Sequence, residues 1–172
     1  LVEPLDLGLD QEVAAGARRG CVGLDPAPGI AVHRGEGERA EDALETLGGI
    51  VAALPLLGPA PFIVTSGDIV TDFDYATLKD PAAAIAAGAA DAHLVLVDNP
   101  VFHQHGDMGC VDGRIDPDAA RHLTYANIGV FAPRLFDGLQ PVRARLFPWL
   151  YAAARAARVT GEHFRGRWYN VG

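Results

Sequence analysis

FIVTSGD, at residues 62–68, joins a short apolar and partly β-branched run to a polar end. Runs of this kind are typical of strands that are buried on both faces, as in a parallel sheet. Two further runs have a similar apolar character, HLVLV at 93–97 and LTYANIGVF at 123–131. We therefore expect central strands at these three places.

Helical patterns lie between and after these strands. Apolar residues recur at helical spacing over 43–57, where Pro55 lies near the end of the run. Further helices are predicted at 75–78, 81–90, 133–139 and 147–158, a terminal strand at 163–171, and weaker elements at 10–17 (helix) and 29–33 (strand). Strands that alternate with helices indicate an α/β fold with a mostly parallel sheet, built as a single domain over 1–172.

The composition narrows the classes of partner. The 172 residues carry a net charge of −8, which argues against nucleic acid and anionic membranes as partners because both select basic surfaces. Neither a secretory signal nor an apolar run long enough to span a membrane is visible. Cys21 and Cys110 have no metal-ligand spacing, so we expect reduced thiols in a cytoplasmic protein. We also expect the chain to be a monomer.

Polar residues follow several of the predicted strands. Ser66, Gly67 and Asp68 end one strand, Asp98 and Asn99 the next, and residues 170–172 the last. Ligands of open α/β sheets bind outside the carboxyl ends of strands, and a carboxylate aimed from such an end suits Mg²⁺. A lone Gly-Asp after a strand is more often a plain turn than a binding site.

Five segments in order resemble blocks of the sugar-1-phosphate nucleotidyltransferase family, in particular its bacterial N-acetylmuramate-1-phosphate uridylyltransferases. They are ALETLGGIVAALPLLG, PFIVTSGDIVTDFD, AHLVLVDNP, LTYANIGVF and VTGEHFRGRWYNVG, which run from about residue 43 to residue 172. The resemblance implies a Rossmann-like three-layer nucleotidyltransferase fold. Nothing in residues 1–40 is similar to the family's glycine-rich triphosphate loop, and its closing helix is not matched. We therefore expect a fold that is incomplete at both ends.

The resemblance also implies site residues. Asp68 falls on the family's Gly-Asp motif as the catalytic ligand of Mg²⁺, and Asn170 falls on the second metal position, where the strict form has aspartate. The predicted substrate-binding residues are Glu45, Thr46, Gly48, Gly49, Gly67 and Asn127.

The implied reaction is nucleotidyl transfer, in which a sugar 1-phosphate attacks the α-phosphorus of a nucleoside triphosphate and pyrophosphate leaves. UTP and an amino-sugar 1-phosphate are the favoured substrates, in the recycling of peptidoglycan sugars. The alternatives are a guanylyl- or thymidylyltransferase that acts on a hexose 1-phosphate, and an inactive fragment or binding module of the family.

Other polar motifs have competing interpretations. His103, His105 and Asp107 form His-x-His-x-Asp, for which a solvated or sugar-contacting loop is favoured over a metal site, because no further ligands complete a set. For Asp72 and Asp74, which follow Asp68 closely, a solvated loop or a helix N-cap is favoured over additional metal ligands. The arginines that remain as candidates for phosphate contact are Arg143, Arg145, Arg165 and Arg167.

Overall fold

The computed structural model describes residues 21–22, 29–33 and 44–172 of the chain. The helix predicted at 10–17 and most of the segment 1–40 lie outside the described residues. Within the part that is described, no helix is both long enough and apolar enough to cross a membrane.

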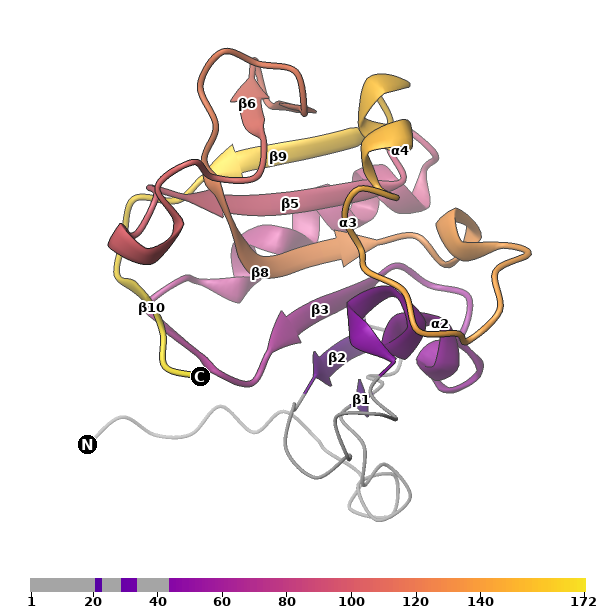
Figure 1. Ribbon diagram of the computed structural model, residues 1–172. Coiled ribbons are helices and arrows are strands. Elements are labelled where there is room, and N and C mark those ends of the chain that lie inside the picture. The colour runs from indigo at the N-terminus through magenta and orange to yellow at the C-terminus, as the bar shows by residue number, and fades with distance from the viewer. Residues whose placement is uncertain (1–20, 23–28, 34–43) are drawn as a thin grey trace.

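The strands form one large sheet and one small one (Figure 1). The order in the large sheet is β1 (Cys21–Val22), β2 (Gly29–His33), β3 (Phe62–Ser66), β8 (Thr124–Phe131), β5 (Ala92–Val97), β9 (Val159–His163), β7 (Arg114–Asp116) and β6 (Gly109–Val111). The small sheet pairs β4 (Ile69–Thr71) with β10 (Trp168–Asn170).

The α/β fold class is confirmed, but the expectation of a mostly parallel sheet is only partly right. Among the described strands, β2–β3 and β5–β9 pair in parallel, and β8 lies antiparallel to both β3 and β5. A run of buried apolar residues looks the same in either direction, so its composition could not reveal that β8 is reversed. Because β3 and β5 both oppose β8, their carboxyl ends meet at one edge of the sheet.

Helices cover both faces of the sheet, which gives three layers. Figure 1 shows α2 (Glu45–Leu57) and α4 (Tyr151–Arg155) in front of the sheet and α3 (Lys79–Ala86) behind it. Residues of α2 and α4 share one apolar cluster with Phe62 and Leu94, whereas α3 shares a second cluster with Val95 and Ile128. The alternation of side chains along each strand feeds both clusters. Short 3₁₀ helices follow at η1 (Tyr75–Leu78), η2 (Val101–His103) and η3 (Pro133–Phe136).

The C-terminal third differs most from the sequence-based expectation. The helix predicted at 147–158 is observed only as the five residues of α4. Most of the strand predicted at 163–171 is not a strand, and its regular part is β10. Strand β9 was not predicted. Its sequence VTGEH lacks an apolar run, and it contains Gly161, where an added Cβ would lie 3.0 Å from the Leu94 carbonyl oxygen.

An ion-pair cluster fixes the edge of the sheet where β5 begins. Arg134 Nε and Arg158 Nη2 each donate to Asp91 Oδ1 at 2.9 Å, and Arg158 Nε donates to Asp91 Oδ2 at 2.9 Å. The hydrogen bonds of Arg158, opposed by partial burial and reinforced by Arg134, hold the pKa of Asp91 below its ordinary value. The cluster ties the start of β9 and the segment after β8 to β5.

Candidate functional site

Asp68 lies in the turn between β3 and β4, beside the C-terminal strand β10. Ile69 pairs with Asn170, and the Val171 amide donates to the Asp68 carbonyl oxygen at 2.9 Å. The Asn170 side chain is turned by its own contact, because its Oδ1 accepts the Gly172 amide at 3.0 Å. The structure therefore brings together the two residues that were predicted as metal ligands.

The carboxylate of Asp68 has an atom available for a cation. Its Oδ1 is buried and has no hydrogen-bond partner among the described residues. A buried carboxylate oxygen without a partner is costly, and hard oxygen atoms are the ligands that Mg²⁺ prefers. Among the described residues, no group of three or more His, Cys, Asp or Glu side chains is arranged to hold a metal. A magnesium ion at Asp68 would therefore need amide oxygens, water and substrate phosphates as its other ligands, which is usual for this ion.

Asn127 occupies an irregular point of β8. Its φ angle is +56°, and the pairing of β5 with β8 shifts between Leu94–Gly129 and Leu96–Tyr125. Asparagine tolerates the left-handed region better than most residues, and bulges of this kind redirect side chains near functional sites. The bulge places Asn127 among the residues that line two neighbouring cavities.

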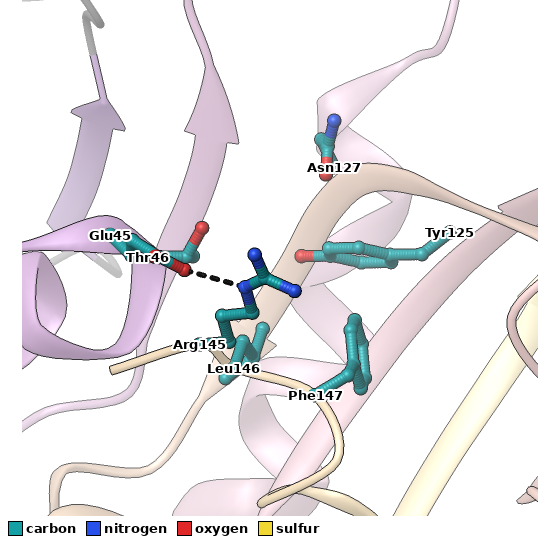
Figure 2. A pocket seen from close by; sticks show the side chains of 7 residues that line it. All are labelled: Glu45, Thr46, Tyr125, Asn127, Arg145, Leu146 and Phe147. Carbon is teal, nitrogen blue, oxygen red and sulfur yellow. Dashed lines mark hydrogen bonds and ion pairs between the residues drawn. The ribbon is translucent and has the colours of Figure 1, made fainter. Parts of the chain in front are cut away.

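The first cavity, cavity 1, has a volume of about 310 Å³ and lies between the start of α2 and β8. It is lined by Glu45, Thr46, Tyr125, Asn127, Arg145, Leu146 and Phe147. Figure 2 shows the Arg145 guanidinium between Glu45 and the Tyr125 hydroxyl, with the Phe147 ring below Tyr125. Three of the predicted substrate-binding residues, Glu45, Thr46 and Asn127, thus face one space.

Glu45 is engaged within the protein. Arg143 Nε donates to its Oε1 at 3.1 Å and Arg145 Nε donates to its Oε2 at 3.0 Å. Partial burial raises the pKa of Glu45, but the two arginine hydrogen bonds together outweigh it and the pKa lies below its ordinary value. Glu45 therefore orients Arg145 at the cavity, in addition to any contact with a ligand.

The second cavity, cavity 2, has a volume of about 220 Å³ and lies beside β10. It is lined by Phe102, His103, Asp107, Thr124, Tyr125, Asn127, Phe147, Trp168 and Asn170. Because Tyr125, Asn127 and Phe147 line both cavities, the two cavities adjoin, and together they are called the groove. Asn170 connects cavity 2 to the turn that carries Asp68.

No family model matches the chain, but individual proteins of known family do. The chain is 38% identical over 133 residues to the N-acetylmuramate alpha-1-phosphate uridylyltransferase of Neisseria meningitidis serogroup B (strain ATCC BAA-335 / MC58). The chain belongs to the sugar-1-phosphate nucleotidyltransferase family. The match covers 75% of the chain but only 57% of that relative's length.

Solved structures of the family share the fold. A protein of Bacillus anthracis assigned as a glucose-1-phosphate thymidylyltransferase, in complex with sucrose, superposes with a TM-score of 0.57 at 11% identity, over 73% of this chain and 55% of that one. HddC of Yersinia pseudotuberculosis, complexed with GMP-PN, gives 0.55 at 13% identity, over 76% and 58%. The expected nucleotidyltransferase fold is thereby confirmed.

The three glycines predicted to bind substrate line neither cavity. Gly67 is exposed in the turn before Asp68, and Gly49 is half-buried in α2. Gly48 is buried, and a Cβ added there would collide with the carbonyl oxygen of Val142. Close packing of α2 against the chain segment that carries Arg145 therefore explains Gly48, and contact between these glycines and a ligand stays a prediction.

Sequence reasoning missed several residues of the groove, among them the aromatic residues Tyr125 and Phe147. Tyr125 is buried, which raises its pKa, and its ring meets Phe147 edge-on with centroids 5.5 Å apart. Its place two residues before Asn127 on the same strand was a usable signal, because such residues share a face. Phe147 had no comparable signal, since only the fold brings its loop to β8.

The other polar motifs have structural roles. The Asp74 carboxylate caps η1 by accepting the Ala76 amide at 2.9 Å, as predicted. Asp72 accepts Arg167 Nε at 3.0 Å, and the hydrogen bonds of Arg167 lower the pKa of Asp72. Trp168 forms part of the wall of cavity 2 and donates from Nε1 to the Ala126 carbonyl oxygen at 2.9 Å.

Proposed function

We propose that the chain transfers a uridylyl group from UTP to N-acetylmuramate 1-phosphate and releases pyrophosphate. The observation that carries this proposal is the 38% identity, over 133 residues, to a uridylyltransferase with that acceptor. The proposed setting is the recycling of peptidoglycan sugars in the cytoplasm, by a monomer.

Each part of the groove has a role in this proposal. Asp68 and Asn170 would hold Mg²⁺ and, through it, the phosphates of both substrates. The bound ion would neutralise the negative charge that develops at the α-phosphorus. Thr46 and Asn127 offer hydrogen-bonding groups to the nucleotide and sugar, and the aromatic side chains of the groove offer them apolar contact. Little covalent chemistry is asked of the protein, because orientation and charge neutralisation supply most of the rate.

A second candidate is transfer of another nucleotide to a hexose 1-phosphate. It is favoured by the fold neighbours, among them a protein assigned as a thymidylyltransferase and a UDP-glucose pyrophosphorylase that superposes with a TM-score of 0.51 in its complex with UDP-glucose. These neighbours share 11% and 16% identity with the chain, so they bear on the fold more than on the substrate. A module that binds these substrates without turnover is the third candidate.

A pyrophosphate-release assay with a panel of substrates tests the proposal. UTP, GTP and dTTP are each paired with N-acetylmuramate 1-phosphate and with glucose 1-phosphate, in the presence of Mg²⁺. We expect the highest kcat/KM for UTP with N-acetylmuramate 1-phosphate. A higher value for another pair would establish the second candidate, and binding without pyrophosphate release would establish the third.

A further inference from the structure

The motif His103-x-His105-x-Asp107 is built into the wall of cavity 2. His103 Nε2 lies 3.1 Å from Asp107 Oδ1, and the other carboxylate oxygen of Asp107 accepts the Tyr125 amide at 2.8 Å. Asp107 is thereby fixed to the start of β8, and the imidazole is fixed to Asp107. The carboxylate sets which ring nitrogen is engaged and leaves Nδ1 for another partner.

The loop that carries this pair is held in place from several sides. Asn99 Nδ2 donates to the carbonyl oxygens of Gln104 and His122, at 2.9 and 3.1 Å, and Thr124 Oγ1 donates to Asn99 Oδ1 at 2.9 Å. Gly106 has a φ of +63°, and a Cβ there would lie 2.7 Å from Asn99 Oδ1. A binding residue on such a loop loses little conformational freedom when a ligand arrives.

Cavity 2 has the character of a sugar site. Its aromatic walls, Trp168 and Phe147 among them, suit the apolar faces of a pyranose ring, and the amides of Asn127 and Asn170 suit its hydroxyl groups. Asn170 marks the end nearest Asp68, where the phosphates would lie. His103 is thus placed to meet a substituent of the sugar rather than its phosphate.

The charged groups of cavity 2 indicate which kind of sugar substituent His103 would bind. Of the described residues that line cavity 2, His103 is the one side chain that can carry a positive charge. A doubly protonated imidazole donates from both nitrogens, from Nε2 to Asp107 and from Nδ1 to a ligand. A carboxylate is the acceptor that gains most from such a donor. N-acetylmuramate carries a lactyl carboxylate, which N-acetylglucosamine lacks.

We propose that His103 is a specificity residue that binds the carboxylate of an acidic amino-sugar 1-phosphate in cavity 2, and that Asp107 is its positioning residue. This inference rests on the proposed function for the identity of the sugar. It differs from that proposal in that it concerns binding, and it holds whether or not the chain turns over.

Direct titration tests the inference separately from catalysis. N-acetylmuramate 1-phosphate and N-acetylglucosamine 1-phosphate are each titrated into the full chain by calorimetry, with His103→Ala, Asp107→Asn and His105→Ala as variants. His105 is exposed on the same loop and does not line the cavity, so its variant is the matched control. Imidazole signals followed by NMR in the unmodified chain provide a second measurement that does not depend on a variant's folding.

We expect His103→Ala to weaken binding of N-acetylmuramate 1-phosphate by about 10- to 100-fold, the usual range for a hydrogen bond to a charged group. Asp107→Asn should weaken the same ligand in the same direction. Binding of N-acetylglucosamine 1-phosphate should stay unchanged in all three variants, and His105→Ala should change neither ligand. The His103 imidazole signal should move only with the acidic sugar.

Two results would overturn the inference. Equal affinity for both sugars, unaffected by His103→Ala, would remove the specificity role and leave the proposed transfer reaction intact. Failure of the unmodified chain to bind N-acetylmuramate 1-phosphate would overturn both. Selective binding that depends on His103, without release of pyrophosphate from UTP, would support the inference and refute the proposed activity of the chain.

Discussion

Gly48 offers a sharp test of how the groove is built, because Gly48→Ala adds a single carbon at a crowded contact. The added Cβ would collide with the Val142 carbonyl oxygen, which belongs to the backbone and cannot rotate away. The Leu47 amide donates to the Ala144 carbonyl oxygen at 3.0 Å, and the Ala144 amide donates to the Leu44 carbonyl oxygen at 3.0 Å. Helix α2 and the segment carrying Arg143 and Arg145 would have to separate, which strains these bonds.

The size of the effect follows from two opposed contributions. Overpacking of a closely packed contact costs about 1–3 kcal/mol, and the rigid backbone neighbour places this site in the upper half of that range. Alanine regains about 1 kcal/mol over glycine in a helix interior. The net loss is then about 1–2 kcal/mol, which lowers the Tm of a domain of this size by about 2–8 °C.

Thermal unfolding followed by far-UV circular dichroism measures this loss. Ala52→Ser, on the exposed face of the same helix, is the matched control and should stay within about 0.5 kcal/mol of the unmodified chain. An unchanged or raised Tm in Gly48→Ala would refute the packing argument. A raised KM for the nucleotide with an unchanged Tm would instead identify Gly48 as a ligand contact, as the family resemblance implies.

Three further predictions concern charge. Asp91→Asn should lower the unfolding free energy by about 1–3 kcal/mol at pH 7, because Arg134 and Arg158 lose a charged acceptor. Since the folded-state pKa of Asp91 is depressed, this difference between the two chains in urea unfolding should shrink as the pH falls below about 4. A difference that stays constant with pH would contradict the assignment. Burial lowers the pKa of His93 against the opposing effect of Glu162, so as the pH falls the imidazole is protonated in the unfolded chain before it is protonated in the folded one. The unmodified chain should therefore lose more unfolding free energy than His93→Gln between about pH 6.5 and pH 5. Parallel pH profiles of the two chains in urea unfolding would count against this. Asn170→Asp should lower the Mg²⁺ concentration that gives half-maximal pyrophosphate release, because a carboxylate replaces a neutral amide, and an unchanged magnesium titration would exclude Asn170 as a ligand.

The sequence was most informative where local patterns and order along the chain decide the structure. Strands at 62–66 and 92–97 and the helix at 45–57 follow from short-range periodicity, so the predicted positions agree closely with β3, β5 and α2. The closeness of Asp68 to Asn170 was also accessible, because both residues follow or end strands in blocks that resemble one family. Asn127 entered through the same resemblance.

Features that depend on distant contacts were not accessible. The reversal of β8 changes no residue of its apolar run, and β9 is a strand mainly because β5 and β7 flank it. The contacts of Glu45 with Arg143 and Arg145 join residues 98 and 100 positions apart, which no local pattern predicts. The lining of cavity 1 by Phe147 and the packing role of Gly48 likewise depend on contacts between distant parts of the chain. They therefore emerged only with the fold.

The central claim is that chemistry occurs where Asp68 meets Asn170 and the groove, and kcat of pyrophosphate release in Asp68→Asn tests it most directly. The matched control is Asp98→Asn, since Asp98 follows strand β5, is 69% exposed and lines neither cavity. Loss of the carboxylate that holds Mg²⁺ removes several kcal/mol of transition-state stabilisation, so kcat should fall about 100-fold or more in Asp68→Asn and stay within about threefold in Asp98→Asn. Activity retained in Asp68→Asn, or lost equally in both variants, would contradict the account.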